Sequence, residues 1–246
     1  LTVMALIVVG GIGFLTWDDI RANKLHLHRY RMQSKVILST TALLIVLPAI
    51  WFYFGEFFAL SGKERLLASL FQSVTPRTAG FNTADLTALS GVGQGLTIML
   101  MLIGGSPGST AGGMKTTTAA VLFANAIAVF QRRSEPHFFG RRIDNKAVCS
   151  ASTVCFMYLT LFLGGGFVIS AVEKLPLSAC LFETASAVGT VGLSLVLPPS
   201  LGLLSQGILI ALMFIGRVGG LTLIYAALSG FSKTASRLPQ ERITVG

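Results

Sequence analysis

The sequence has few charged residues for its length. Only 12% of the 246 residues are Asp, Glu, Lys or Arg, whereas 52% are hydrophobic. A water-soluble domain of this size carries about a quarter charged residues. The charges also fall in clumps, which leaves apolar stretches longer than the ~20 residues that a helix needs to cross a bilayer. The composition therefore predicts an all-α polytopic membrane protein and excludes disordered chains and nucleic-acid-binding domains, so no nucleic acid is expected as a partner.

Cysteine and acidic residues are also scarce. The three cysteines, Cys149, Cys155 and Cys180, lie in apolar runs, which favours packing roles over a disulfide framework. We find no His/Glu metal spacing, no paired membrane acids and no Ser/Lys dyad, so we expect neither an enzyme nor a cofactor in this chain. The sequence opens inside an apolar run without the basic region of a signal peptide, and we expect it to be a fragment that begins within a transmembrane helix.

The basic residues predict the orientation in the membrane. Residues 21–35 and 131–146 contain five Lys or Arg residues each, and residues 231–246 contain three. Because cytoplasmic loops are enriched in Lys and Arg, these three segments, including the C-terminal tail, are predicted to be cytoplasmic in a multi-pass protein of the cell membrane. The segments around 56–90 and 171–202 hold fewer basic residues and are expected outside. His26, His28 and His137 fall in the basic segments, where solvated side chains are expected rather than metal ligands.

The same order of segments occurs twice. Short apolar stretches at residues 66–73 and 177–186 are too short to cross a bilayer and are expected to be half helices. Each precedes an uncharged glycine turn and then a further apolar segment. The pattern predicts two repeats of helix, half helix, glycine turn and helix, over residues 36–130 and 147–230. Residues 1–20 are expected to be the last helix of an earlier repeat.

The two glycine turns have the composition of a cation site. The first glycine turn comprises Thr78, Ala79, Gly80 and Phe81, and the second comprises Thr190, Val191, Gly192 and Leu193. A helix that ends within the membrane directs its C-terminal dipole and the following carbonyls at one point, which suits a dehydrating cation. Glycine allows the left-handed backbone that turns successive carbonyls to one side. The alternative is an ordinary pair of external loops.

Residues 91–130 are too long for a single crossing and should form two half helices around an intramembrane loop. The central loop, residues 104–113, is rich in glycine and contains a proline, which a regular helix does not tolerate. Its candidate gating residues, together with the lysine that follows, are Gly105, Ser106, Pro107, Gly108, Ser109, Thr110, Gly112, Gly113 and Lys115. A nucleotide-binding loop fits poorly, because Met114 separates the glycines from the lysine and the flanks are apolar helix. A glycine-rich packing seam remains the alternative.

Arg217 lies within the apolar residues 203–230 and is therefore expected near the bilayer centre. A charge at that depth is costly unless it faces a polar cavity or a partner. One interpretation is a fixed positive charge beside a cation path. The other is a structural contact with Glu183 or with loop carbonyls.

Four sequence strings carry a resemblance to a known family. SVTPRTAGFNT (73–83), GGSPGSTAGGMKTTT (104–118), GTVGLS (189–194) and GRVGGLT (216–222) resemble the Trk/Ktr/HKT superfamily of potassium transporters, and GTVGLS looks more like its bacterial KtrB-type subunits. The resemblance implies a pore of four helix, pore-loop, helix repeats, as in potassium channels, and a homodimer of such subunits in membrane lipid. It also implies K⁺ at the carbonyls of residues 78–81 and 190–193, a gate at residues 104–113 and a pore-facing Arg217.

The resemblance further implies a cytoplasmic nucleotide-binding regulatory subunit. Selectivity for K⁺ over Na⁺, and any coupling to Na⁺, follow from family membership alone, because the expected fragment contains only two of four pore loops. A secondary transporter with broken helices is the alternative function.

Overall fold

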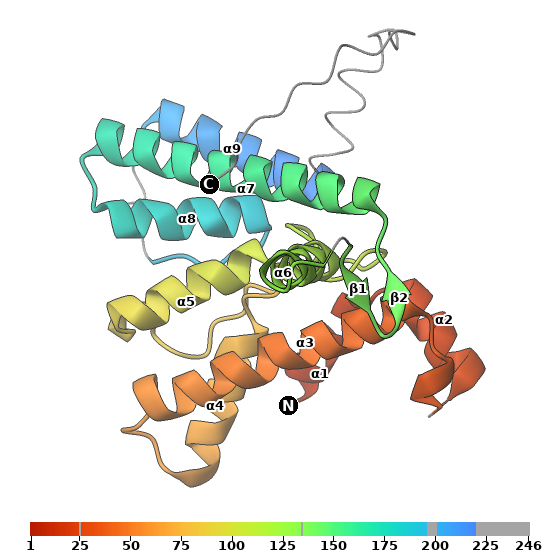
Figure 1. Cartoon of the computed structure of the whole chain (residues 1–246). Helices are drawn as coiled ribbons and strands as arrows, with labels where there is room; N and C mark the ends of the chain where they lie inside the picture. The colour runs from red at the N-terminus through yellow and green to blue at the C-terminus, as the bar shows by residue number, and fades with distance from the viewer. Residues whose placement is uncertain (25, 134, 196–200, 220–246) are drawn as a thin grey trace, which may run out of the picture.

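The computed structural model describes residues 1–24, 26–133, 135–195 and 201–219, which are mostly helical (Figure 1). The repeated order of elements is present in these residues. α3 (Met32–Trp51) continues through one π-helical turn to Glu56 and is followed by the short α4 (Gly62–Val74) and by α5 (Gly91–Leu102). α7 (Asn145–Glu173) is followed in the same way by the short α8 (Leu177–Gly189) and by α9 (Leu203–Val218).

The first helix of each repeat is long and apolar enough to cross a membrane. Met32–Glu56 and Asn145–Glu173 meet this criterion, whereas α4, α5, α8 and α9 are too short. α8 packs between α7, α9 and α5, and α4 packs against α3. The helical class predicted from composition is confirmed, and the half helices run to Val74 and Gly189, slightly beyond the predicted ends.

The N-terminal segment differs from the single helix expected over residues 1–20. It forms α1 (Thr2–Ile12) and α2 (Phe14–Asn23), which meet at an angle of 95°. Gly13 between them has a φ of 92°, and a Cβ at this position would lie 2.5 Å from the carbonyl oxygen of Pro107. The elbow therefore needs glycine both for its backbone conformation and for its close approach to the central loop.

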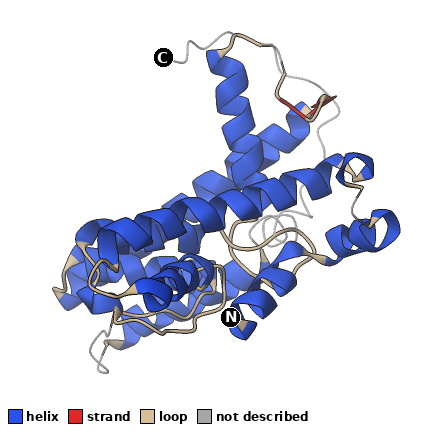
Figure 2. Cartoon of the chain, turned by 90° about the horizontal axis from the view of Figure 1, so that it is seen from below, coloured by secondary structure: helices blue, strands red, loops and turns tan. Residues whose placement is uncertain are grey.

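The predicted break between residues 91 and 130 is confirmed. α5 ends at Leu102 and α6 (Thr116–Phe130) begins after the central loop. α6 is seen end-on in Figure 1 and lengthwise in Figure 2, at a steep angle to the other helices. It packs on α7 and α3, and its buried residues Ala120, Ala124 and Ala128 recur at the four-residue spacing of one helix face.

The basic segments contain more regular structure than the loops expected there. α2 reaches Asn23 and α3 begins at Met32, both within residues 21–35. The buried Asp19 accepts hydrogen bonds from the Arg31 N–H (3.1 Å) and the Ser34 hydroxyl (2.5 Å), which ties α2 to the start of α3. Residues 131–146 include a small hairpin of β1 (His137–Phe138) and β2 (Arg141–Arg142).

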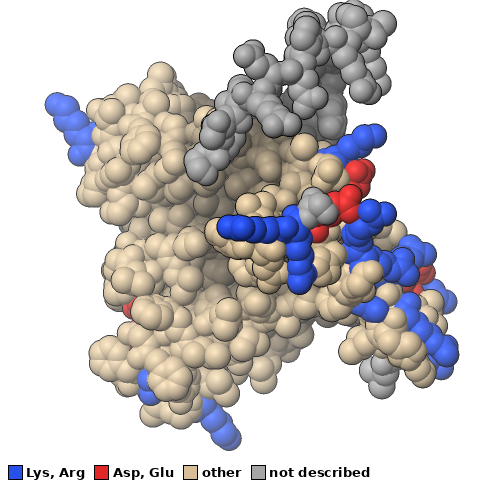
Figure 3. All heavy atoms as spheres, viewed as in Figure 1, with Lys and Arg blue, Asp and Glu red and all other residues tan. Residues whose placement is uncertain are grey.

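Lys and Arg side chains gather at one end of the molecule. Figure 3 shows most of them on the side where α2 and the hairpin lie, with only a few at the opposite end. This grouping places residues 21–35 and 131–146 at the same end of the molecule. The predicted tail 231–246 and residues 220–230 lie outside the described residues.

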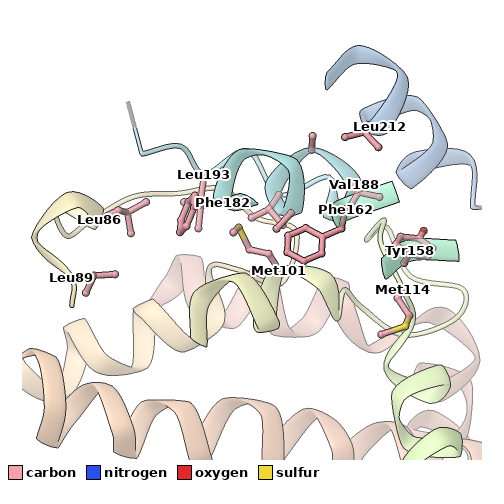
Figure 4. Packing of buried hydrophobic residues seen from close by; sticks show 13 residues of the cluster. Leu86, Leu89, Met101, Met114, Tyr158, Phe162, Phe182, Val188, Leu193 and Leu212 are labelled. Atoms are coloured by element: carbon pink, nitrogen blue, oxygen red, sulfur yellow. The ribbon is translucent and has the colours of Figure 1, made fainter. Parts of the chain in front are cut away.

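The hydrophobic core surrounds α8 and the second glycine turn. Phe182 and Val188 of α8 are fully buried, and they pack with residues from α5, α7 and α9 (Figure 4). Leu193 of the second glycine turn belongs to the same cluster and is only 2% exposed. The core thus supports one of the two candidate cation turns directly.

Candidate ion filter and gate loop

The two glycine turns share an unusual backbone conformation. Thr78 and Gly80 have φ values of 61° and 72°, and Thr190 and Gly192 have values of 53° and 91°. Left-handed residues thus recur at the same two positions of each turn. Glycine adopts this conformation freely, but a β-branched threonine does so at a cost of about 1–2 kcal/mol. The left-handed backbone thus includes two threonines as well as the two glycines.

The first glycine turn is held by polar contacts to the end of α4. The N–H groups of Ala79 and Gly80 donate to the carbonyl oxygen of Thr75 at 3.3 and 3.4 Å, and the Thr75 hydroxyl donates to the carbonyl of Phe81 at 2.5 Å. Arg77, which is 4% exposed, extends toward α3 and donates to the Thr41 hydroxyl at 3.3 Å. The side chains of Thr75 and Arg77 therefore hold the first glycine turn in place.

The second glycine turn is held by one serine and by the core. The Val191 N–H donates to the carbonyl of Ser186 at 2.9 Å, and the Gly192 N–H donates to the Ser186 hydroxyl at 3.1 Å. Val191 and Leu193 are both buried. Glu183, one helical turn before Ser186, accepts hydrogen bonds from the Ser194 hydroxyl (2.5 Å) and the Leu195 N–H (2.9 Å).

The two glycine turns lie against each other. A Cβ built on Gly80 would be 2.2 Å from the carbonyl oxygen of Val191 and 3.4 Å from Cα of Gly192. Only glycine allows this approach. The tertiary fold therefore brings together the two turns that the sequence singles out, although they lie more than a hundred residues apart in the chain.

The central loop is closed at its base. The Gly104 N–H donates to the Met114 carbonyl at 2.8 Å, and the Thr116 N–H donates to the Gly105 carbonyl at 3.0 Å. The hydroxyl groups of Ser106 and Thr116 are also hydrogen-bonded, at 3.0 Å. These contacts let the chain leave α5 and return to α6 while the loop between them stays compact.

The central loop packs against both glycine turns. A Cβ on Gly104 would be 3.4 Å from Cγ2 of Thr78, and a Cβ on Gly112 would be 2.1 Å from Oγ1 of Thr190. The left-handed threonines therefore face the loop. This arrangement places residues 104–113 directly beside the two candidate cation turns.

The central loop is tied to helices on two sides. On one side, the Ser106 N–H donates to the Gly11 carbonyl (2.9 Å), and the Phe14 N–H donates to the Gly108 carbonyl (3.1 Å). On the other side, the Gly113 N–H donates to the Gly216 carbonyl (3.2 Å). Lys115 donates to the Ala111 carbonyl at 2.6 Å and so closes the loop on itself.

Arg217 contributes the remaining tie. Its guanidinium donates to the Thr110 carbonyl at 2.7 Å, so of the two structural contacts considered for it the loop carbonyl is the one present. Glu183 makes its hydrogen bonds to Ser194 and Leu195 instead, and the ion pairs of the described residues are Asp19 with Arg31 and Glu135 with Arg142. Arg217 lies in the last turn of α9 (Leu203–Val218), and residues 220–230 lie outside the described residues.

Several supporting residues are not evident from the sequence. Thr75, Ser186 and Glu183 hold the glycine turns, and Ser106 with Thr116 closes the central loop. The only local signal is a hydroxyl residue a few positions before each glycine turn, a common pattern that has many other causes.

The two glycine turns contain oxygen-bearing groups but no carboxylate, imidazole or thiol side chain. In the part of the chain that the structure describes, no three His, Cys, Asp or Glu side chains converge. The oxygen atoms of residues 78–81 and 190–193 are those of the backbone carbonyls and of the Thr78 and Thr190 hydroxyl groups.

The connection after the first glycine turn carries one further polar contact. Asp85 accepts hydrogen bonds from the side chain and the N–H of Thr87, which lower the pKa of the carboxyl group below its ordinary value. The carboxylate is exposed to solvent.

Comparison with known proteins gives consistent matches. The chain is 40% identical to the potassium/sodium uptake protein NtpJ of Enterococcus hirae, over all of this chain and 57% of that protein. It is 33% identical to the Ktr system potassium uptake protein B of Bacillus subtilis, over all of this chain and 56% of that protein. The chain thus spans a little over half the length of the curated relatives it matches.

The fold also matches a solved structure. The crystal structure of the potassium transporter TrkH from Vibrio parahaemolyticus aligns with a TM-score of 0.75 at 18% identity, over 91% of this chain and 50% of that one. Residues 1–234 match the family described as TrkH: Cation transport protein. The chain therefore belongs to the TrkH family of cation transport proteins.

Proposed function

We propose that this chain is part of the ion-translocating membrane subunit of a potassium uptake system. In this proposal, K⁺ sheds water as it passes the carbonyl groups of residues 78–81 and 190–193, and the central loop gates the path. Pore-loop repeats of this kind line a single conduction path when they meet around one axis. The subunit works as a transporter and not as an enzyme.

The single observation that carries the proposal is the pairing of the two glycine turns. They share left-handed residues at matching positions, and Gly80 lies against the carbonyl of Val191. Non-helical backbone at membrane depth is tolerated where it lines a cavity or is buried in protein. Two such turns in contact, each at the end of a short helix, supply carbonyl dipoles to one shared point.

The names of the relatives support the ion. NtpJ is named a potassium/sodium uptake protein, and the Bacillus subtilis relative is named a potassium uptake protein. We propose K⁺ as the transported ion, with Na⁺ as a second or coupled cation. The remaining filter carbonyls come from the portion of the relatives that this chain does not cover.

The gate follows from the contacts of the central loop. The loop touches Thr78 and Thr190 and is tied to α1 and α2 on one side and to α9 on the other. Breaking either set of ties lets the loop swing away from the glycine turns. The hydrogen bond from Arg217 to Thr110 is the charged member of these ties and sits beside the proposed path.

The partners follow from the same proposal. The basic face that includes α2 and the hairpin lies in the cytoplasm, where it contacts anionic lipid headgroups and a nucleotide-binding regulatory subunit. The complete subunit forms a homodimer in the cell membrane.

Ion uptake by the full-length protein tests the function. Cells that lack their own potassium uptake should grow at low K⁺ and accumulate Rb⁺ when they express it. Removing several residues between Gly105 and Gly112 should raise the flux, because the loop occupies the path. A well-folded protein that moves no monovalent cation, or that moves an organic substrate instead, would show that a broken-helix transporter is the better description.

Cysteine labelling tests the orientation. In a background with Cys149 and Cys155 replaced by serine, Phe139→Cys on the hairpin should be shielded from an impermeant thiol reagent added outside, whereas Ala88→Cys should label. Both positions are exposed, so accessibility within the protein does not distinguish them. The reverse labelling pattern would contradict the cytoplasmic assignment.

A further inference from the structure

Glu183 is a carboxylate in the middle of α8, a short helix whose other residues are apolar, small or hydroxyl-bearing. A charge in such a helix at membrane depth is costly, so its contacts indicate what it does. One oxygen, Oε1, accepts hydrogen bonds from both the Ser194 hydroxyl (2.5 Å) and the Leu195 N–H (2.9 Å). Charge-assisted hydrogen bonds of this kind are stronger than neutral ones.

We propose that Glu183 is a positioning residue for the second glycine turn. Its carboxylate holds the segment that leaves the turn, at Ser194 and Leu195, against α8, and thereby fixes the carbonyls of residues 190–193. This inference rests on the proposed function of those carbonyls in K⁺ selection.

The position of Glu183 relative to Ser186 supports this role. The two residues are three apart in a helix and therefore share a face. Ser186 holds the turn itself through Val191 and Gly192, whereas Glu183 holds the segment after it. The Ser186 side chain thus holds Gly192, and the Glu183 side chain holds Ser194 and Leu195, against the same face of α8.

Among the described residues, packing leaves one side of the second glycine turn and of residues 194–195 open. A cavity of about 520 Å³ is lined by Glu183, the second glycine turn, Ser194 and Arg217. Gly192 and Ser194 are exposed toward open space, in contrast to the buried Val191 and Leu193. The segment after the turn therefore has room to move, and the two hydrogen bonds to Glu183 oppose that movement.

The first glycine turn uses a different device. The residue that matches Glu183 in the first repeat is Phe71, which cannot accept a hydrogen bond. There the Thr75 hydroxyl binds the carbonyl of Phe81 directly. The Glu183 contact therefore belongs to the second turn alone.

Glu173 provides a matched control within the same repeat. It also accepts hydrogen bonds through Oε1 from a serine hydroxyl and a backbone N–H, at 2.5 Å from Ser205 and 2.9 Å from Gly202. These contacts join the end of α7 to the start of α9 and do not involve the glycine turn. The two carboxylates thus have nearly the same hydrogen-bond geometry at two different places.

The experiment compares Rb⁺ uptake and its competition by Na⁺ in the full-length protein. Glu183→Ala should lower the preference for Rb⁺ over Na⁺ by about three- to ten-fold, because it removes two hydrogen bonds from the loop. Glu183→Gln should stay within about two-fold of wild type, since its amide oxygen still accepts both. Glu173→Ala should keep the wild-type preference.

Ser194→Ala covers the case in which Glu183→Ala does not fold. It should shift the preference in the same direction but by less, and in the Glu183→Ala background it should add nothing further. An unchanged preference in well-folded Glu183→Ala or Ser194→Ala overturns the inference. The inference is also overturned if Glu183→Gln lowers the preference for Rb⁺ over Na⁺ as much as Glu183→Ala does, because the effect would then come from the charge. Failure of the wild-type protein to take up Rb⁺ would instead overturn the proposed function.

Discussion

The glycine turns at residues 78–81 and 190–193 have left-handed residues at the same positions, but they differ in the side chains that hold them. The first turn is held by polar side chains: the Thr75 hydroxyl donates to the Phe81 carbonyl, and the buried Arg77 donates to the Thr41 hydroxyl. Behind the second are Ser186 and the hydrophobic cluster around Phe182. The two turns share a conformation without sharing the contacts that hold it.

This difference explains why the internal repeat is faint in the sequence. The positions that fix backbone conformation, threonine and glycine in alternation, are the same in both turns. The neighbouring positions correspond in the sequence but differ in burial: Phe81 is 57% exposed, whereas its counterpart Leu193 is 2% exposed. A repeat can therefore keep the backbone conformation of its glycine turn while the supporting residues diverge.

The largest expected difference is in stability. Leu193→Ala should destabilise the protein by about 2–4 kcal/mol, because it leaves a cavity in the core around α8. Phe81→Ala should cost less than about 1 kcal/mol, because more than half of the ring is already exposed. Thermal unfolding of the two variants in detergent measures both. Equal losses would mean that the two turns are supported alike.

The second comparison uses the two glycines. Gly80→Ser should reduce the preference for K⁺ over Na⁺ by about ten-fold or more, because its Cβ would meet the carbonyl of Val191 as well as requiring a positive φ. Gly192→Ser should cause a smaller loss, because the nearest atom to its Cβ is 3.9 Å away and only the backbone strain remains. Competition between Rb⁺ and Na⁺ uptake measures the ratio. If Gly192→Ser has the larger effect, contact between the turns does not determine selectivity.

The third comparison concerns two carboxylates, each at the end of the first helix of its repeat. Glu56 accepts hydrogen bonds from the N–H (3.0 Å) and hydroxyl of Ser90, at the start of α5, and Glu173 does the same for the start of α9. Glu56→Ala and Glu173→Ala should each cost about 1 kcal/mol, as for the loss of a helix cap. Unfolding in detergent should show similar shifts for both, and a much larger shift for one would show that the repeats differ here too.

The smallest expected effect is at the central loop. Arg217→Gln should raise the ion flux by about two- to three-fold, since it weakens one of several ties and leaves those to Gly11 and Phe14 in place. Lys115→Gln, which affects a contact within the loop, should leave the flux nearer to wild type. Initial rates of Rb⁺ uptake at matched expression measure both. A larger change in Lys115→Gln would show that closure of the loop on itself, rather than its tie to α9, restrains it.

The parts of the fold that depend on local chemistry could be predicted from the sequence. Five glycines and Pro107 within the ten residues 104–113 disfavour a helix, so the break between α5 and α6 is visible in the residues themselves. The short helices α4 and α8 follow from the length of their apolar stretches. The positive φ of Gly80 and Gly192 is a conformation that glycine readily adopts.

The parts that depend on tertiary contacts could not be predicted. The left-handed Thr78 and Thr190 run against the preference of their side chains and are fixed only by the surrounding chain. The elbow at Gly13 interrupts an apolar run that has no other sign of a break, because the Pro107 carbonyl that requires it lies almost a hundred residues away. Glu183 appears in the sequence as an isolated charge, and its partners are known only once the turn is folded.

The elbow at Gly13 also has a mechanical consequence. α2 starts at the central loop, where the Phe14 N–H binds the Gly108 carbonyl, and extends to the basic face, where Asp19 binds the start of α3. A ten-residue helix is a stiff rod about 15 Å long. A rotation of α2 at the basic face therefore moves the central loop directly, with Gly13 as the pivot. No segment between them has to change its secondary structure.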